Sequence, residues 1–498
     1  MSWRSIGLSC IALWVWQSGC SGEDELPTVP VSRGSDGGRD AGQETEVADA
    51  APDAAESRGE TPHWPEAEQE LELPYGGPTV TTVLTVGAQP SALDVHLNVD
   101  TTGSIRFAID ELQVALRGTV IARLRARVKD VAFGVSRFAD FPVPPFGRPA
   151  SKSRKADRAF VLLSPVTTSV ERVVSAVSRL DVPLDHGGDD PEASAEALYQ
   201  VATGAGYSVG GDRLIERRPS TAAFGGGTLG GVGFRDNALH VVLHVADTPS
   251  HTPEQYEAGG LPGTRSWAET TAALNELAAR VVSIMPTGCD GGPCREAFPY
   301  RPTRQELSEL AIATQATAAA VGGECPTGID QGLLPAYQSV CPLVFDVRAD
   351  GTGLSRTLSD AVLALLEQVR WKEVHAEPSD DHLGFMRELR VTTVAQPEGV
   401  PAPQARDRLP AGAPDGVADS YVDVDRRSQL GFSLSLRNDR IAPRDEPQRF
   451  RIAVQVLGDG VLLEERFVRV VVPALRKDAP PPESSGHVAE DPDLDAGR

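Results

Sequence analysis

The stretch Leu93–Leu112, LDVHLNVDTTGSIRFAIDEL, decides the fold of this chain. The apolar run before Asp100 is typical of a buried strand, and from Ile105 onward apolar residues recur at helical spacing. The turn between these segments carries Asp100, Thr102 and Ser104. Because ligands in open α/β sheets bind beyond the carboxyl ends of the strands, these three side chains are the first candidates for a functional site.

Strand and helix patterns alternate from residue 88 to about 370. Buried-strand patterns recur at 238–247 and 341–347, and residues 130–141 predict a pair of strands. Helical patterns lie at 169–180, 192–202, 267–285 (running into a strand), 304–323 and 355–369. This alternation predicts an α/β fold over 88–370, with a mostly parallel, Rossmann-like central sheet flanked by helices.

The chain on either side of this domain has a different composition. Residues 371–475 alternate apolar and polar side chains around a Gly-Asp-Gly turn, which predicts a small antiparallel β domain. Residues 21–78 are rich in Gly, Ala, Pro, Asp and Glu without an apolar period. This composition predicts a disordered acidic linker, and the tail 476–498 has the same character.

Residues 1–20 have the pattern of an export signal. Arg4 precedes an apolar core that is too short for a permanent membrane span, and small residues precede Cys20. Cys20 resembles the lipidated cysteine of bacterial lipoproteins, although Gln17 stands where leucine is usual. We therefore expect export to the cell envelope and a lipid anchor in the outer membrane or at the cell surface of a Gram-negative bacterium. Cleavage of an ordinary secretory signal nearby is the alternative.

Cys10 lies in the predicted signal, and the cysteines that follow Cys20 agree with export. Cys289, Cys294, Cys325 and Cys341 form an even set, which in an oxidising compartment predicts two disulfides. The simplest pairing joins Cys289 to Cys294 and Cys325 to Cys341, although four cysteines allow three pairings. A metal site is the rival interpretation, but neither a CxxC spacing nor nearby histidines support it.

The acidic net charge and the side chains near Asp100 favour a metal cation over nucleic acid as the ligand. The net charge of −23 would repel phosphates over most of the surface. Two later segments offer partners for the Asp100 turn: GGDDPEAS places Asp189 and Glu192 before a helix, and Asp247 ends a second buried strand. Carboxylates and hydroxyls together suit Mg²⁺ or Ca²⁺ better than Zn²⁺.

These segments resemble von Willebrand factor type A domains. Residues 100–104, DTTGS, match the Asp-x-Ser/Thr-x-Ser motif of that family's metal-ion-dependent adhesion site. The integrin β-subunit I-like domains look closest within the family. Three further segments are similar to integrin segments in the same order: VAFGVSRFADFPVPPFG (131–147), DDPEASAEALYQVA (189–202) and GFRDNALHVVLHVADTPSH (233–251).

The resemblance implies a metal site formed by Asp100, Thr102, Ser104, Glu192 and Asp247. In the family the ion, Mg²⁺ or else Ca²⁺ or Mn²⁺, receives an acidic group of a protein partner at its vacant position. A second ion would use Asp189 and backbone near Pro191, where Gly187 replaces the family's Asn. Phe107 and Ala108 replace the carboxylates of the family's inhibitory calcium site, so we expect that site to be absent.

We therefore expect a cell-surface binding or adhesion protein, not an enzyme, that captures a carboxylate of a protein partner through a divalent cation. No nucleophile with an adjacent base stands out. One alternative is a metal-assisted hydrolase of the envelope with Glu192 as base. Another is a structural envelope component whose metal site is vestigial. For the DTTGS motif itself, simple helix capping by Thr102 and Ser104 is the alternative.

Overall fold

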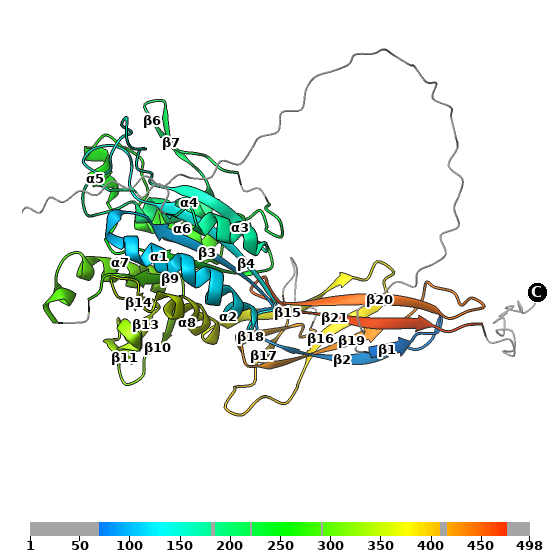
Figure 1. Cartoon of the computed structure of the whole chain (residues 1–498). Coiled ribbons are helices and arrows are strands. Elements are labelled where there is room, and N and C mark those ends of the chain that lie inside the picture. The colour runs from blue at the N-terminus through cyan, green and yellow to red at the C-terminus, as the bar shows by residue number, and fades with distance from the viewer. Residues whose placement is uncertain (1–68, 181–184, 220–221, 290–291, 409–415, 476–498) are drawn as a thin grey trace, which may run out of the picture. The chain divides into compact units, whose positions relative to one another are not determined.

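The computed structural model describes residues 69–180, 185–219, 222–289, 292–408 and 416–475 (Figure 1). The predicted export signal with Cys20, residues 21–68 of the predicted linker and the predicted tail 476–498 lie outside the described residues. Within the described ranges, no helix has both the length and the apolarity that crossing a membrane requires.

A six-stranded sheet in the order β14-β9-β8-β3-β4-β5 forms the centre of the α/β part. Its strands are β3 (Ala92–Asp100), β4 (Asp130–Phe138), β5 (Val161–Thr167), β8 (Leu239–Val245), β9 (Arg280–Met285) and β14 (Val344–Asp346). All neighbours are parallel except β5, which is antiparallel to β4. Every residue of β3 and β8 is buried, because both strands lie inside the sheet and helices cover its two faces.

Helices form a layer on each face of this sheet (Figure 1). On one face α1 contacts both α3 and α8, and α2 contacts α8, whereas α6 contacts both α4 and α7. The bounds are α1 (Arg106–Ala115), α2 (Ile121–Arg125), α3 (Val170–Val177), α4 (Ser194–Thr203), α5 (Pro253–Ala258), α6 (Trp267–Glu276), α7 (Tyr300–Ala313) and α8 (Leu354–Glu367). A π-helical turn, η2 (Leu116–Val120), joins α1 to α2. The predicted α/β fold class is confirmed.

Local sequence explains where several helices begin and end. The side chain of Ser169 accepts a hydrogen bond at the start of α3, and Thr252 and Ser266 form capping boxes at the starts of α5 and α6. Gly204 ends α4 in the left-handed conformation, with φ of 61°. Helix α7 ends before the predicted residue 323, because the chain reverses at Gln315, which has φ of 59°.

The remaining strands form antiparallel sheets. One has the order β1-β21-β20-β15-β18-β17, in which only β1 and β21 are parallel, and a second has the order β16-β19-β2. The bounds are β1 (Gln69–Glu72), β2 (Val80–Gly87), β15 (Arg370–Asp380), β16 (Met386–Thr392), β17 (Gln404–Arg406), β18 (Ser420–Asp425), β19 (Gln429–Leu436), β20 (Gln448–Gly458) and β21 (Val461–Val472). The predicted β-rich C-terminal part is therefore present.

Two strands of these sheets come from the chain before the α/β part. β1 pairs with β21, and β2 pairs with β19 over its whole length. Residues 69–72 were predicted to belong to the linker, and that prediction is wrong, because the segment Gln69–Glu72 is an edge strand whose Leu71 packs against the core. A charged edge strand has few apolar residues and resembles linker in composition.

Residues 130–141 were predicted to be a pair of strands, but they form the single strand β4 and the start of a loop. The next residues, FPVPPF, contain three prolines, which lack the N–H that a sheet ladder requires. Short two-stranded sheets lie outside the main sheets: β6 (Tyr207–Val209) with β7 (Asp212–Ile215), β10 (Thr317–Ala319) with β13 (Val340–Pro342), and β11 (Glu324–Cys325) with β12 (Leu334–Pro335).

Both predicted disulfides are present. Cys289 is bonded to Cys294, with 5.9 Å between their Cα atoms, and Cys325 is bonded to Cys341, with 5.4 Å. The second bond joins β11 to β13. The simplest of the three pairings is therefore confirmed.

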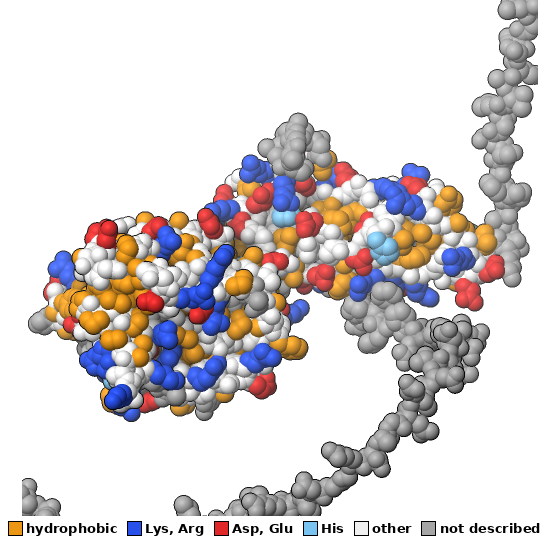
Figure 2. Space-filling view, turned by 90° about the horizontal axis from the view of Figure 1, so that it is seen from above, with side chains coloured by type: hydrophobic (Ala, Val, Ile, Leu, Met, Phe, Trp, Pro, Cys, Tyr) orange, Lys and Arg blue, Asp and Glu red, His pale blue; other side chains and the backbone are white. Residues whose placement is uncertain are grey.

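The surface is less uniformly acidic than the net charge of −23 suggests. On the face seen in Figure 2, Lys and Arg side chains gather over the α/β part, where Asp and Glu side chains are sparser. Repulsion of anions therefore differs from one part of the surface to another.

Candidate metal centre

The predicted site forms where the parallel strands β3 and β8 end. Asp100 is the last residue of β3 and is fully buried, and its Oδ1 accepts a hydrogen bond from the backbone N of Thr102 at 2.8 Å. Oγ1 of Thr102 lies 3.1 Å from Oγ of Ser104. Ser104 in turn hydrogen-bonds to Asp247, which follows β8. One tight turn and one neighbouring strand end therefore bring four of the five predicted residues together.

Helix capping does not account for the two hydroxyls. Thr102 precedes the 3₁₀ turn η1 (Gly103–Ile105), and no side-chain cap hydrogen bond forms there or at the start of α1. The hydroxyl groups of Thr102 and Ser104 contact each other instead, and that of Ser104 lies beside the carboxylate of Asp247.

Glu192 is brought to the same cluster by a loop that pairs with the chain after β8. Its backbone N donates to the carbonyl of Pro249 at 3.0 Å, and its carbonyl accepts from the N of His251 at 3.0 Å. Gly187 lies against the Glu192 carboxylate: it has φ of 63°, and a Cβ there would be 2.5 Å from Oε1. A side chain at this position, where the resemblance expects Asn, would therefore press on the Glu192 carboxylate.

Burial and mutual repulsion disfavour negative charge on this cluster. Burial, followed by the charge of Asp247, raises the pKa of Asp100 to about 8. Burial also raises the pKa of Asp247 to about 6, against the hydrogen bond from Ser104. For Glu192, burial and then the charges of Asp100 and Asp140 raise the pKa well above its ordinary value. Without a compensating cation, these carboxylates hold their protons more tightly than exposed ones.

The carboxylates of this cluster also have oxygens without hydrogen-bond partners. Oδ2 of Asp100, Oε2 of Glu192 and Oδ1 of Asp247 are all buried, and none has a partner among the described residues. A buried acceptor left unsatisfied costs roughly 1–3 kcal/mol, so three in one cluster require an explanation. A hard divalent cation fits, because the donors are carboxylate and hydroxyl oxygens.

A second group of ligating atoms lies beside the first. Asp140, Asp189 and His251 each offer an atom within 4.8 Å of the others. Nε2 of His251 is 3.1 Å from Oδ1 of Asp189 and 3.4 Å from Oδ2 of Asp140. The hydroxyl of Tyr256 donates to Oδ1 of Asp140 at 2.7 Å. The group could hold a second ion, and its imidazole suits Mn²⁺ or Zn²⁺ better than Ca²⁺.

The sequence prediction included Asp189 but missed the other two members of this second group, Asp140 and His251, and also Tyr256, which donates to Asp140. Asp140 lies two residues beyond the end of β4, the strand next to β3, so its position relative to a strand end was a usable signal. His251 and Tyr256 follow Asp247 in the chain, but nothing in their local pattern shows that they turn back towards Asp140.

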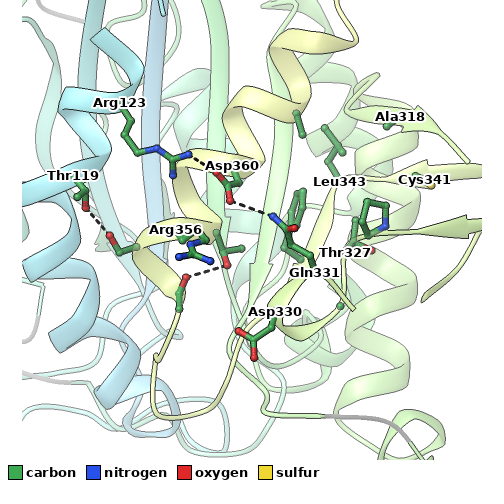
Figure 3. A pocket seen from close by; sticks show the side chains of 17 residues that line it. Thr119, Arg123, Ala318, Thr327, Asp330, Gln331, Cys341, Leu343, Arg356 and Asp360 are labelled. Carbon is green, nitrogen blue, oxygen red and sulfur yellow. Dashed lines mark hydrogen bonds and ion pairs between the residues drawn. The ribbon is translucent and has the colours of Figure 1, made fainter. Parts of the chain in front are cut away.

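A cavity of about 820 Å³ lies elsewhere, between α8, η2, α2 and the segment around the Cys325–Cys341 disulfide (Figure 3). Several polar groups on its wall contact one another. Arg123 pairs with Asp360 at 2.7 Å, and Nε2 of Gln331 lies 3.5 Å from the other oxygen of Asp360. Ser355 and Thr119 are hydrogen-bonded at 2.6 Å. The five residues of the predicted metal site do not line this cavity.

No protein-family model and no curated protein sequence matches the chain. Among solved structures, a von Willebrand factor type A protein from Catenulispora acidiphila is similar at 12% identity and a TM-score of 0.29, covering 82% of this chain and 72% of its own. The pilus adhesin SpaC from Lactobacillus rhamnosus GG, in its open conformation, is similar at 9% identity and a TM-score of 0.32, covering 79% and 45%. Proximal thread matrix protein 1 from the mussel byssus matches at 12% identity and a TM-score of 0.27, covering 57% and 48%.

Proposed function

We propose that this protein binds a divalent cation, Mg²⁺ in the first instance, and through it an acidic group of a protein partner. The observation that carries the proposal is the set of three buried carboxylate oxygens without partners, on Asp100 at the end of β3, on Asp247 after β8 and on Glu192. Asp100, Thr102, Ser104, Glu192 and Asp247 would hold the ion. The cation would supply a positive charge to which a partner's carboxylate can bind.

The residues of the proposed cation site have different roles. The N–H of Thr102 fixes one oxygen of Asp100 and orients the other. The backbone hydrogen bonds of Glu192 to Pro249 and His251 hold its carboxylate over the same cluster. Thr102 and Ser104 are neutral ligands, so the site retains fewer negative charges than an all-carboxylate cage. A cation held in this way keeps more net positive charge for an acidic partner.

We propose binding rather than catalysis. A hydrolase would need a general acid beside the cation and a base free to move a proton. Glu192, the base of the hydrolase alternative, is buried and lies among Asp100, Asp140 and Asp247, whose charges all oppose its ionisation. A cation bound beside Glu192 would offset those charges and favour the ionised carboxylate as a ligand.

We further propose that the chain is exported and lipid-anchored at the cell surface. The support is the pattern of residues 1–20, with Arg4, a short apolar core and Cys20. A surface anchor would present the metal site to partners outside the cell. Mass spectrometry of the N-terminal peptide from membranes, compared with a Cys20→Ala variant, tests the anchor: lipid on Cys20 supports it, and an unmodified N-terminus elsewhere contradicts it.

Calorimetric titration of Mg²⁺ and then Ca²⁺ into the whole chain tests the cation site. Saturable binding that is lost in Asp100→Ala and Asp247→Ala, but kept in Asp110→Ala, supports it. The Asp110 side chain is exposed on α1 and matches the change in charge. Absence of binding at millimolar ion contradicts the proposal.

A peptide array tests the partner's chemistry. Arrayed peptides containing Asp or Glu should retain the protein only in Mg²⁺, and the same peptides with Asn or Gln should not. Retention that persists in EDTA, or that ignores the amide substitution, contradicts recognition through a cation.

A further inference from the structure

A basic cavity of about 470 Å³ lies beside β5, the edge strand of the central sheet. Four cationic side chains line it: Arg137, Lys155, Arg158 and Arg218. The single carboxylate among its described lining residues is that of Glu216, which pairs with Arg213 at 3.1 Å. Its apolar lining comes from Phe160, Val161, Leu162, Leu214 and Ile215.

The cations come from segments that are far apart in the sequence. Residues 148–158, RPASKSRKADR, carry five basic side chains, and residues 213–218, RLIERR, carry three more. The chain as a whole has 70 acidic and 47 basic residues, so both segments reverse the prevailing charge. Folding places them around one cavity, with Arg137 of β4 at its inner side.

Two acidic groups near these cations already have partners, and one of them, Asp185, forms an ion pair with Arg137 of the cavity. Asp157 is buried, and its carboxylate accepts hydrogen bonds from the backbone N of Arg148 at 2.7 Å and of His186 at 3.2 Å. Asp185 lies 3.8 Å from Arg137 and accepts a hydrogen bond from Thr101 at 2.8 Å. Within the described ranges, the exposed side chains of Lys155, Arg158 and Arg218 form no ion pair.

The positive surface continues past the cavity. A neighbouring hollow of about 330 Å³ shares Ile215 with it and is lined by Arg213 and Arg217 beside Tyr207. Figure 2 shows the corresponding gathering of Lys and Arg side chains on the face from which β6 and β7 project in Figure 1. Like charges held together around a cavity repel one another, and a bound anion would relieve that repulsion.

We propose that this cavity binds a phosphate-bearing ligand, independently of the metal site. A phosphate monoester carries about −1.5 to −2 charges at neutral pH, which several converging cations can balance. Guanidinium groups match phosphate oxygens in pairs, and the cavity has Arg158 and Arg218 at its exposed side. The apolar lining accommodates the carbon skeleton attached to the phosphate. The ligand is either a soluble phosphate ester or the head group of an anionic lipid.

The test measures binding of two probes to the whole chain in EDTA, so that no cation at Asp100 can recruit phosphate. The first probe is tripolyphosphate in calorimetry, and the second is phosphatidylglycerol vesicles in co-sedimentation. The variant replaces Lys155, Arg158 and Arg218 by Ala. A matched control replaces Lys372, Arg172 and Arg449 by Ala, since these are exposed cations outside the cavity.

We expect the Lys155/Arg158/Arg218 variant to bind at least about tenfold more weakly, and the control variant to bind like the unaltered chain. High salt should also weaken binding by the unaltered chain. Tripolyphosphate binding identifies a soluble phosphate ester as the ligand class, and binding to vesicles alone identifies a lipid head group. Absence of binding to both probes overturns the proposal, as does equal weakening in both variants. Unchanged thermal unfolding of the variants ensures that lost binding does not reflect lost folding.

Discussion

The backbone N–H of Thr102 donates to one carboxylate oxygen of Asp100 at 2.8 Å, and the other oxygen of that carboxylate is buried without a partner. The turn after β3 therefore holds the carboxylate in place and leaves one acceptor available. This is an unfavourable arrangement for an empty site, because the unpaired oxygen has lost its water. It becomes favourable when a cation takes that oxygen as a ligand.

Replacing Asp100 by Asn should separate the metal site from the fold. Asn keeps an acceptor for the N–H of Thr102 but removes the negative charge. We expect Mg²⁺ affinity to fall roughly 100-fold or more. In EDTA near neutral pH, the free energy of unfolding should rise by about 1 kcal/mol, because Asn, unlike Asp100 with its raised pKa, need not take up a proton on folding. Calorimetry and urea unfolding measure the two effects, with Asp110→Asn as the control, and a large loss of stability in EDTA would contradict this account.

Stability without metal should fall as pH rises. Burial raises the pKa of Asp100 to about 8 and that of Asp247 to about 6, whereas both have ordinary values of 3.8. Between about pH 4 and pH 8 the folded chain holds protons that the unfolded chain has released, so deprotonation works against folding. Thermal unfolding across this window in EDTA should show a falling midpoint, and saturating Mg²⁺ should flatten the slope. A slope that Asp100→Asn with Asp247→Asn leaves unchanged would assign the effect to other groups.

Removing the hydroxyl of Tyr256 should destabilise the second acidic group. That hydroxyl donates to Oδ1 of Asp140 at 2.7 Å, and both side chains are buried. Tyr256→Phe should cost about 1–3 kcal/mol in urea unfolding, because it removes one donor from a buried carboxylate. The control is Tyr199→Phe, which also removes a tyrosine hydroxyl. The Tyr199 ring packs against the guanidinium of Arg265, 4.7 Å from the ring centroid, and Phe keeps that ring. Equal effects of the two substitutions would rule out a particular role for the Asp140 hydrogen bond.

The two disulfides should stabilise the fold unequally. Cys325 and Cys341 are 16 residues apart, and Cys289 and Cys294 are only 5 apart. By the chain-entropy relation, removing the disulfide that closes the longer loop should lower the free energy of unfolding by about 3 kcal/mol, and removing the other should lower it by about 2 kcal/mol. Paired Cys→Ser variants compared by urea unfolding measure this order. If the Cys289–Cys294 variant lost more free energy of unfolding, loop length would not be what decides how much each disulfide stabilises the fold.

The sequence by itself determined the features that depend on local pattern. Leu93, Val95, Leu97 and Val99 recur at every second position before Asp100, so the sequence predicted a strand that ends there; the structure buries its polar residues as well. The DTTGS turn predicted the contacts among Asp100, Thr102 and Ser104, because residues so close in the chain cannot lie far apart. Disulfide pairing was accessible in the same way, since each bond joins cysteines that are near in sequence.

Only the tertiary structure decided which distant segments meet. Asp140 and His251 are unremarkable in their own segments, and their proximity depends on the order of β4, β3 and β8 in the sheet. The sequence predicted linker at β1 because its partner, β21, lies almost 400 residues further along the chain. An ion pair between Glu70 and Arg469 joins the two strands. The basic cavity likewise requires 148–158 and 213–218 to be brought together. Such contacts are fixed by the packing of whole layers, and no local spacing in the chain encodes them.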